Sequence, residues 1–596
     1  MSQNIYDVAI CGSGLAGLTL ARQLKLKMPD ISIVLLDRLA RPLPEAAFKV
    51  GESTVEVGAF YLANILQLED YLEEHHLHKL GLRYFLGDAH GPFHKRPEVG
   101  LSEFHSPNSY QIDRGLLEND LRQLNAEAGI ELLEKCLVKD IKLTEEQNQP
   151  QVPEFNAELP TSNQQQPHQV IYAQGDNKTE RTIQARWIID AMGRRRFLQK
   201  KLDLTRPNNP QFSAVWFRLD GRLDVSDFVP KTEQKWHDRV PNNNRYYSGN
   251  HLCGEGYWIW IIPLSSGYTS VGIVTDEKVH AFGEYHTYDK AYRWLTKYEP
   301  TLAFHLKDKQ LADFHKIPQY SYSSKQMFSP NRWACVGVAG IFPDPFYSPG
   351  TDLIGFGNSL TCQMIEQDLE GKLTPETVDD ANRFLIQYSD SLATNIHNAY
   401  LCFGNETVMA MKYLWDVLSG WAFSAPLMFN SLFLDPAKRA RVRKGAGQFF
   451  LLSYRMNQLF RDWSAKSLRR TSFEFIDYLE IPLIKELRSR NLKTDKTEQE
   501  LIEDHIASIQ MFEEFAQVIF LLAVEDTMPE KLADFPTSMW LNAWAISLNE
   551  QQWSANGLFR PVSTARDLRP LMNQIRHYLH QKPASRPMVA SLSNPR

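Results

Sequence analysis

The first residues of the chain whose types and spacing could do chemistry are the glycines of the string CGSGLAG. Gly12, Gly14 and Gly17 have the spacing G-x-G-x-x-G, and Asp37 follows the last of them after twenty residues. Such glycines allow a tight turn, a close approach of a pyrophosphate to the backbone, and close packing of a helix on a strand. The motif by itself leaves FAD and NAD open as ligands. The residues predicted to bind the nucleotide are Gly12, Ser13, Gly14, Leu15, Ala16, Gly17, Asp37 and Arg38.

A second set of residues alternates along the string WIWIIP. Trp258, Trp260 and Ile262 fall on one face of a predicted strand, because successive side chains of a strand point to opposite faces. Pro263 ends the string. Two neighbouring indoles would form a rigid apolar wall. The alternative is that they are ordinary core residues, since aromatic side chains are readily buried.

A lysine and a glycine-containing turn could supply polar groups. Lys79 lies in HKLGLRYF, and residues 336–355 read VGVAGIFPDPFYSPGTDLIG. A lysine taken alone is usually solvated. A buried lysine amine, however, can orient or carry an electrophile, and burial decides which protonation form is present.

These strings together resemble those of flavin-dependent halogenases. The W-x-W-x-I-P pattern and HKLGLRYF match segments typical of that family. Three more strings resemble flavin enzymes of the halogenase and aromatic-hydroxylase group, namely FKVGEST at 48–54, YQIDRGLLENDL at 110–121, and IIDAMGRRR. The resemblance implies that FAD is the cofactor. The residues that it adds to the FAD site are Val50, Gly51, Glu52, Arg114, Asp190 and Gly337.

The resemblance also implies a reaction. Reduced FAD, oxygen and chloride or bromide would give hypohalous acid, and Lys79 with Ser348 would direct the halogen to an aromatic ring. The halide would lie at Pro349, Gly350 and Thr351. The implied wall of the substrate tunnel consists of Trp258, Trp260, Ile262, Pro263 and Tyr347.

Three positions depart from the family pattern. Val338 stands where most relatives have an Asp that contacts the flavin, Tyr347 stands where tryptophan halogenases have a Glu, and Pro349 has no N–H to donate to a halide. The substrate implied is therefore a phenol, pyrrole or related ring, free or bound to a carrier protein, rather than free tryptophan. Two alternatives are an FAD-dependent aromatic hydroxylase or reductase on the same scaffold, and a degenerate relative that acts as a scaffold.

The hydrophobic pattern predicts the elements that position these residues. IYDVAIC and residues 15–27 and 31–36 predict a strand, a helix and a strand; residues 211–275 predict an antiparallel sheet; helical patterns follow residue 359. The fold class is α/β, with a Rossmann-like FAD-binding domain of the glutathione-reductase/hydroxylase type. An antiparallel β-sheet substrate domain and a C-terminal helical domain complete it. The predicted boundaries are 1–205 with 336–365 returning to this domain, 206–335, and 366–596.

Composition excludes other classes of protein. The net charge of −6 over 596 residues gives no basic field for nucleic acid. The six cysteines have neither C-x-x-C nor zinc-site spacing, so neither a disulfide framework nor a metal site is predicted. Residues 256–275 and 417–434 are uncharged but carry Ser, Gly and Pro, and no transmembrane span is predicted. We expect a cytoplasmic enzyme whose partners are a small aromatic substrate and, since only one nucleotide motif is visible, a separate flavin reductase.

Overall fold

The string before the glycine motif forms the centre of a parallel sheet. In the computed structural model, which describes residues 5–43, 50–144, 167–175, 178–468, 473–535, 540–560 and 564–579, β1 (Ile5–Cys11) lies between β2 and β10. Helix α1 (Leu15–Lys27) connects β1 to β2 in the way that the pattern predicts, although the second strand begins at Ile33 rather than at residue 31. The other strands of this sheet are β2 (Ile33–Leu36), β7 (Glu131–Leu133), β8 (Cys136–Lys142), β9 (His168–Gln174), β10 (Thr179–Asp190), β18 (Phe328–Ser329) and β19 (Trp333–Cys335).

The second sheet has the predicted antiparallel centre and recruits strands from elsewhere in the chain. Its order is β16-β12-β15-β14-β13-β4-β5-β20. Strand β4 pairs in parallel with β13, and β20 pairs in parallel with β5, so backbone groups that would be left at an open edge find partners. Three strands thus come from outside 206–335. The strands are β4 (Leu82–Phe85), β5 (Glu98–Gly100), β12 (Phe212–Asp220), β13 (Gly249–Gly254), β14 (Tyr257–Pro263), β15 (Tyr268–Asp276), β16 (Leu311–Ile317) and β20 (Phe475–Asp477).

A buried ionic cluster connects β4 and β5 of the second sheet with the 3₁₀ helix Pro241–Tyr247 before β13. Glu98 accepts hydrogen bonds from Arg83 and, at 2.8 Å, from Nε of Arg245. Burial alone would raise the pKa of Glu98, but Arg245 and Arg83 hold it below its ordinary value. The carboxylate is therefore charged in the interior, and its two arginines compensate the cost of desolvation.

The strand that carries WIWIIP separates two cores. Trp258, Trp260 and Ile262 belong to the large core shared with the parallel sheet and the C-terminal helices. Tyr257 and Ile259 belong to a smaller core on the opposite face of β14. The predicted alternation is confirmed. Two helices cover the smaller core, α7 (Tyr288–Tyr298) and α8 (Pro300–Leu306).

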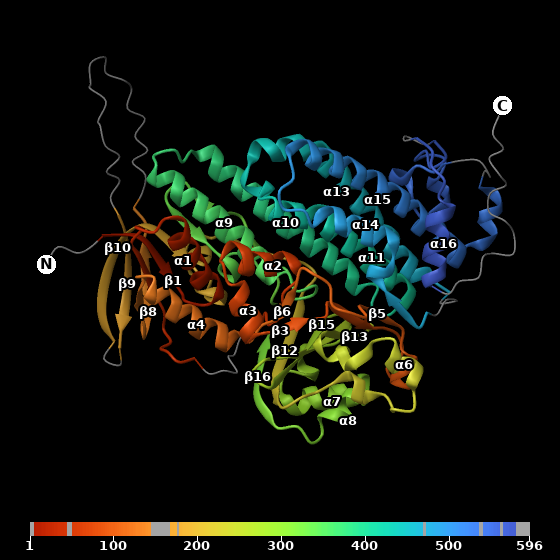
Figure 1. The fold of residues 1–596 in the computed structure, drawn as a ribbon, viewed down its shortest axis with the longest axis horizontal. Coiled ribbons are helices and arrows are strands. Elements are labelled where there is room, and N and C mark those ends of the chain that lie inside the picture. Colours follow the sequence, from red (N-terminus) through yellow and green to blue (C-terminus); the bar gives the residue numbers. More distant parts are fainter. Residues whose placement is uncertain are drawn as a thin grey trace, which may run out of the picture.

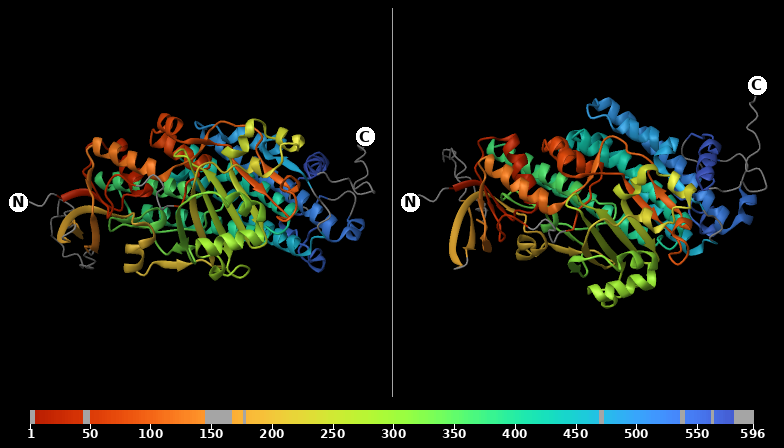
Figure 2. Two further views of the ribbon diagram at one scale, coloured as in Figure 1. Left: turned by 90° about the horizontal axis from the view of Figure 1, so that it is seen from below. Right: turned by 60° about the horizontal axis from the view of Figure 1, so that its bottom comes forward.

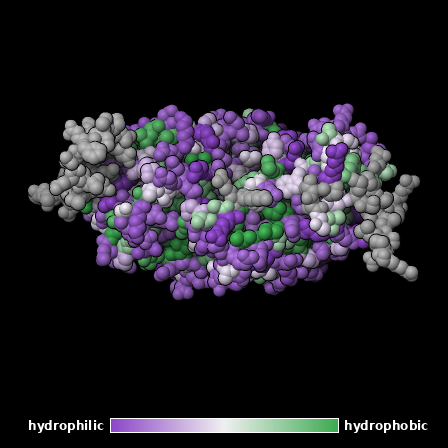
Figure 3. Space-filling model, turned by 90° about the horizontal axis from the view of Figure 1, so that it is seen from above, coloured by the Kyte–Doolittle hydropathy of each residue, from purple (hydrophilic) through white to green (hydrophobic). Residues whose placement is uncertain are grey.

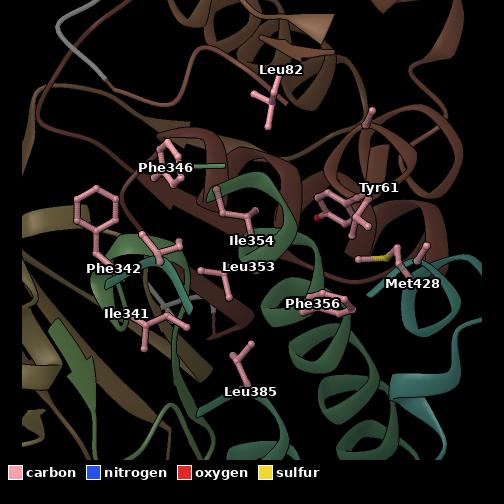
Figure 4. Packing of buried hydrophobic residues seen from close by; sticks show 14 of the residues in the cluster. Tyr61, Leu82, Ile341, Phe342, Phe346, Leu353, Ile354, Phe356, Leu385 and Met428 are labelled. Carbon is pink, nitrogen blue, oxygen red and sulfur yellow. The ribbon is translucent and has the colours of Figure 1, made fainter. Parts of the chain in front are cut away.

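Helices form the rest of the molecule and lie along the side opposite α7 and α8 (Figure 1). Both views in Figure 2 place the parallel sheet at one end and the last helices at the other. The first of these helices, α9, is buried over most of its length, with Tyr61 and Met428 on one side and Leu385 on another (Figure 4). The helices are α9 (Gly350–Leu369), α10 (Pro375–Tyr400), α11 (Glu406–Ser419), α12 (Ala425–Phe429), α13 (Pro436–Lys466), α14 (Pro482–Asn491), α15 (Glu498–Thr527) and α16 (Arg569–Tyr578).

The two stretches considered as membrane spans do not form single long helices. Residues 256–275 form most of β14 and β15, and residues 417–434 run from the end of α11 through α12. Among the described residues, α15 is long and apolar enough to cross a membrane, and 72% of its most apolar window is buried inside the fold, as in the core helix of a globular protein. The α-helices and β-strands not yet named are α2 (Glu56–Phe60), α3 (Glu69–His75), α4 (Arg114–Glu127), α5 (Phe197–Lys201), α6 (Gln234–Asp238), β3 (Leu77–Lys79), β6 (Ser109–Gln111), β11 (Thr205–Pro207) and β17 (Tyr322–Ser324).

Candidate active site

The glycine motif forms a turn that only glycines fit. Gly12 has φ +110°, and a Cβ atom there would lie 2.4 Å from the carbonyl oxygen of Ala191. A Cβ on Gly17 would lie 2.0 Å from the carbonyl oxygen of Gly12. Helix α1 then begins with no side-chain cap and no acid in its first turn. Its N-terminus is therefore suited to the phosphates of a dinucleotide.

Asp37 lies at the end of β2, next to this turn. Its Oδ2 atom accepts hydrogen bonds from the backbone N–H and the hydroxyl of Ser13, both at 2.8 Å, and Oδ1 accepts one from Leu39 N–H at 2.8 Å. Arg122 lies 3.3 Å away. The side chain of Arg38 is exposed. Asp37 is thus held in place at the predicted ribose position.

Arg114 begins α4 and reaches the segment FKVGEST (48–54), called the strap below, which follows β2. Its Nη1 atom donates to the carbonyl oxygens of Val50 at 3.0 Å and Gly51 at 3.3 Å. Its Nε atom is buried and has no hydrogen-bond partner among the described residues. Glu52, in contrast, accepts from Nε of Arg218 on β12 at 2.9 Å, so its side chain joins the two sheets. Residues 48 and 49 of the predicted strap lie outside the described part of the chain.

The second predicted FAD segment packs against the glycine motif. Gly337 has φ +54°, and a Cβ atom there would lie 2.9 Å from Cβ of Ala16. Val338 is half-buried beside it. Asp190 accepts hydrogen bonds from the backbone of Met192 at 3.0 Å and of Leu198 at 2.8 Å, and burial raises its pKa to about 6.

These residues fit FAD. The glycine turn would be filled by any Cβ, the helix after it is uncapped, and Arg114 keeps an unpartnered buried donor near the strap. Val338 contributes no polar atom of its side chain to such a site. The dinucleotide would therefore be held mainly by backbone N–H groups and by Arg114.

Lys79 ends β3 and is almost completely buried. Its Nζ atom donates to the carbonyl oxygen of Thr54 at 2.6 Å, and its Cε atom packs against Gly249. Burial lowers the pKa of Lys79 to about 7, and Glu56 and Asp352 oppose that shift. Both the ammonium and the amine are therefore populated near neutral pH.

Asp352 is a further candidate residue of the site, and the sequence interpretation did not name it. It lies in the first turn of α9, it is buried, and its Oδ1 atom has no hydrogen-bond partner among the described residues. Burial raises its pKa to about 8 and Glu56 adds to that shift, while the N–H of Gly58 and Lys79 oppose it. An Asp in a first helical turn is usually taken as a response to the helix dipole, so its position gave no signal of this contact with Lys79.

The predicted halide segment is a strained turn that leads into α9. Tyr347 and Ser348 have φ +68° and +58°, a conformation that residues other than glycine rarely adopt. The N–H of Ser348 donates to Pro345 at 3.1 Å, and Pro349 is the residue before the helix, which has no side-chain cap. Gly350 and Thr351 therefore supply the first N–H groups of α9, and the binding of a halide there stays a prediction.

The turn is held from behind by a buried acid. Asp344 accepts from the N–H of Phe346 at 2.8 Å and from the hydroxyls of Tyr320 at 2.6 Å and Tyr400 at 3.0 Å. Burial raises the pKa of Asp344 to about 7. The hydroxyl of Tyr347 donates to Asp416 on α11 at 2.8 Å.

The two indoles lie behind this turn. Trp258 donates to the hydroxyl of Tyr400 at 2.8 Å and Trp260 donates to that of Ser270 at 3.1 Å. The ring of Phe346 covers Trp258, with 5.1 Å between ring centroids. Ile262 and Pro263 continue the same buried strand. The structure thus places the wall in the core behind Phe346, and a direct contact with substrate stays a prediction.

A cavity of about 710 Å³ begins at this turn and extends into the helical region. Lys79, Tyr347, Pro349 and Asp352 line its near end, together with Glu56. Residues of α10, α11, α12, α13, α14 and α15 line the rest. The candidate active site is thus a buried amine and a buried acid at the end of a long cavity, beside the N-terminus of α9.

Known proteins of similar sequence include flavin-dependent halogenases. A scan against models of protein families finds no match. The flavin-dependent halogenase chlA of Dictyostelium discoideum is 27% identical over 462 residues, covering 73% of this chain and 72% of that protein. The 1H-pyrrole-2-carbonyl-(peptidyl-carrier protein) chlorinase of Pseudomonas fluorescens is 25% identical over 370 residues, covering 59% of this chain and 74% of that protein.

Solved structures share the fold. The crystal structure of halogenase PltM matches with a TM-score of 0.59 at 17% identity, covering 86% of this chain and 95% of that one. The same halogenase has been solved in complex with phloroglucinol and FAD. The α/β fold predicted for this chain is therefore confirmed.

Proposed function

We propose that this chain, which belongs to the flavin-dependent halogenases, uses reduced FAD, oxygen and chloride or bromide to halogenate an electron-rich aromatic ring. The observation that carries the proposal is the buried amine of Lys79, which lines a cavity beside the N-terminus of α9.

Bound reduced FAD would supply the two electrons that reduce oxygen, so that a halide is converted to hypohalous acid. The residues that would hold it are those of the glycine turn, Asp37, Arg114, Asp190 and Gly337. The N–H groups of Gly350 and Thr351 favour an anion at the start of α9, because helix N-termini carry partial positive charge.

Lys79 would hold the oxidised halogen. As an ammonium it can donate a hydrogen bond to hypohalous acid, and as an amine it can carry the halogen on nitrogen; with a pKa of about 7 both forms are accessible. Halogenation replaces a ring hydrogen, and the displaced proton needs an acceptor. Asp352, buried in the same cavity wall, can take it as a carboxylate, the form that predominates above its pKa of about 8.

The substrate that we propose is a phenol, pyrrole or related ring. Tyr347 stands beside the halide turn where a tryptophan halogenase would have a Glu, and an electron-rich ring needs less help from a base.

Reduced flavin would come from a separate reductase. A cytoplasmic location agrees with six free cysteines, all of them buried.

The test combines purified protein, FAD, a flavin reductase, NADH, oxygen and bromide with a panel of phenols, pyrroles and indoles. Mass spectrometry should show the bromine isotope doublet in at least one product, and its appearance should require bromide. A product with one added oxygen and no halogen would identify a hydroxylase instead. A protein that neither retains FAD nor forms product would identify a scaffold.

A further inference from the structure

The cavity is larger than one aromatic ring requires. Its volume is about 710 Å³, whereas a closed apolar cavity of about 150 Å³ is enough to bind benzene. Lys79 and Asp352 line only its near end. Most of the space therefore faces a part of the substrate other than the ring that reacts.

Aromatic side chains line the distal part of the cavity. Trp421 and Phe423 come from the π-helical turn (Gly420–Ser424) that joins α11 to α12, Phe449 comes from α13, and Phe384 comes from α10. The rings of Phe423 and Phe449 stack with centroids 3.8 Å apart. Single π-helical turns often occur at functional sites. Here the turn contributes two aromatic groups to the wall.

The charged residues of the distal part are engaged with other groups of the fold. Arg439 pairs with Asp380, and Asp504 lies 2.7 Å from Nζ of Lys496. The guanidinium of Arg488 lies over the ring of Trp421 at 5.1 Å. Nη1 of Arg439 is nevertheless buried without a hydrogen-bond partner among the described residues. The distal part therefore offers an aromatic wall to an apolar group, with a few polar atoms beside it.

The most exposed residues that line the cavity come from α10 and α13. The Arg439–Asp380 pair and a hydrogen bond of 2.8 Å from the amide of Asn457 to Asn395 connect these two helices. Phe450 lines the cavity and is 48% exposed. Figure 3 looks on to this side of the molecule and shows apolar residues among polar ones.

We propose that the substrate is an aromatic compound whose reacting ring carries a long apolar substituent, with the ring at Lys79 and the substituent along the distal aromatic wall. This inference rests on the proposed function. It adds the chemistry of the substituent, which the sequence leaves open.

The experiment uses resorcinols with alkyl chains of increasing length, assayed with the full chain, FAD, a flavin reductase, NADH and bromide. Each added methylene should raise kcat/KM about three- to fourfold until the cavity is filled. In parallel, calorimetry without flavin measures the Kd of each compound, which should fall with chain length in the same way. Equal affinity for all chain lengths would overturn the inference.

Two variants on α10 make a matched pair. Ser391→Trp would fill the passage to the distal part, since Ser391 lines the cavity; Thr394→Trp places the same side chain on an exposed position of the same helix. The first variant should remove the dependence on chain length while unsubstituted resorcinol still reacts. The second should leave the dependence unchanged.

The outcomes separate the two proposals. Bromination of resorcinol without any benefit from an alkyl chain would refute the apolar substituent and leave the halogenase intact. Binding that strengthens with alkyl-chain length but gives no brominated product would support the apolar substituent and refute the halogenase.

Discussion

Replacing Lys79 by Met should abolish halogenation, and it should also change how the stability of the fold depends on pH. The variant keeps about the same side-chain volume, is one atom shorter, and removes the buried nitrogen. Halogenated product should be lost, while flavin oxidation continues, because the hydrogen bond of Lys79 is to the carbonyl oxygen of Thr54 and not to one of the residues predicted to bind FAD. Product analysis and oxygen consumption measure the two activities in the same sample.

The effect on stability follows from the pKa of about 7. The folded protein releases the Lys79 proton near pH 7, whereas the unfolded chain keeps it to about pH 10.4. The unfolded state therefore binds more protons above pH 7, so this group makes the wild type more stable as pH rises. Between pH 6 and 9 the gain is about 2.7 kcal/mol, which the Met variant lacks.

The assay is the thermal midpoint of both proteins across that pH range. A gain of about 2.7 kcal/mol corresponds to a change of about 2 °C in the difference between the two midpoints for a chain of this size. Asp352 titrates in the same range, so the pair is also compared in an Asp352→Asn background. Lys316→Met, at an exposed position of β16, is the control and should show no such trend. If the difference between the thermal midpoints of the wild type and the Lys79→Met variant stays constant from pH 6 to 9, Lys79 is not a buried amine with a lowered pKa.

Three further changes probe other parts of the fold. Gly17→Ala should abolish retention of FAD, because the new Cβ would lie 2.0 Å from a carbonyl oxygen of the same turn; absorbance of bound flavin measures it, with Gly283→Ala in open space as control. Asp352→Asn should shift the alkaline part of the pH profile of bromination to lower pH, because Asp352 is a carboxylate above its pKa of about 8 and then raises the pKa of Lys79; an unchanged profile would show that the two groups do not interact. Glu98→Gln should destabilise the fold by about 3–5 kcal/mol by leaving two buried arginines without their anion, and an unchanged midpoint of thermal unfolding would contradict that role.

The sequence by itself determined those features that depend on local spacing. The glycines at 12, 14 and 17 predict a strand, a turn and a helix because their steric requirements lie within one turn of the chain. The alternation of WIWIIP predicts which side chains share a face, and the structure assigns the two faces of β14 to two different cores. The fold class follows from such local patterns.

Tertiary structure decided which distant residues meet. Glu52 stays a predicted FAD residue, and its side chain pairs with Arg218 of the second sheet, 166 residues away. Asp352 faces Lys79 only because α2 and α9 pack together, and β20 joins the second sheet from within the helical region. The long cavity also exists only where several helices fail to fill the space between them. Burial, and with it the pKa of Lys79, depends on these long-range contacts, which no local pattern encodes.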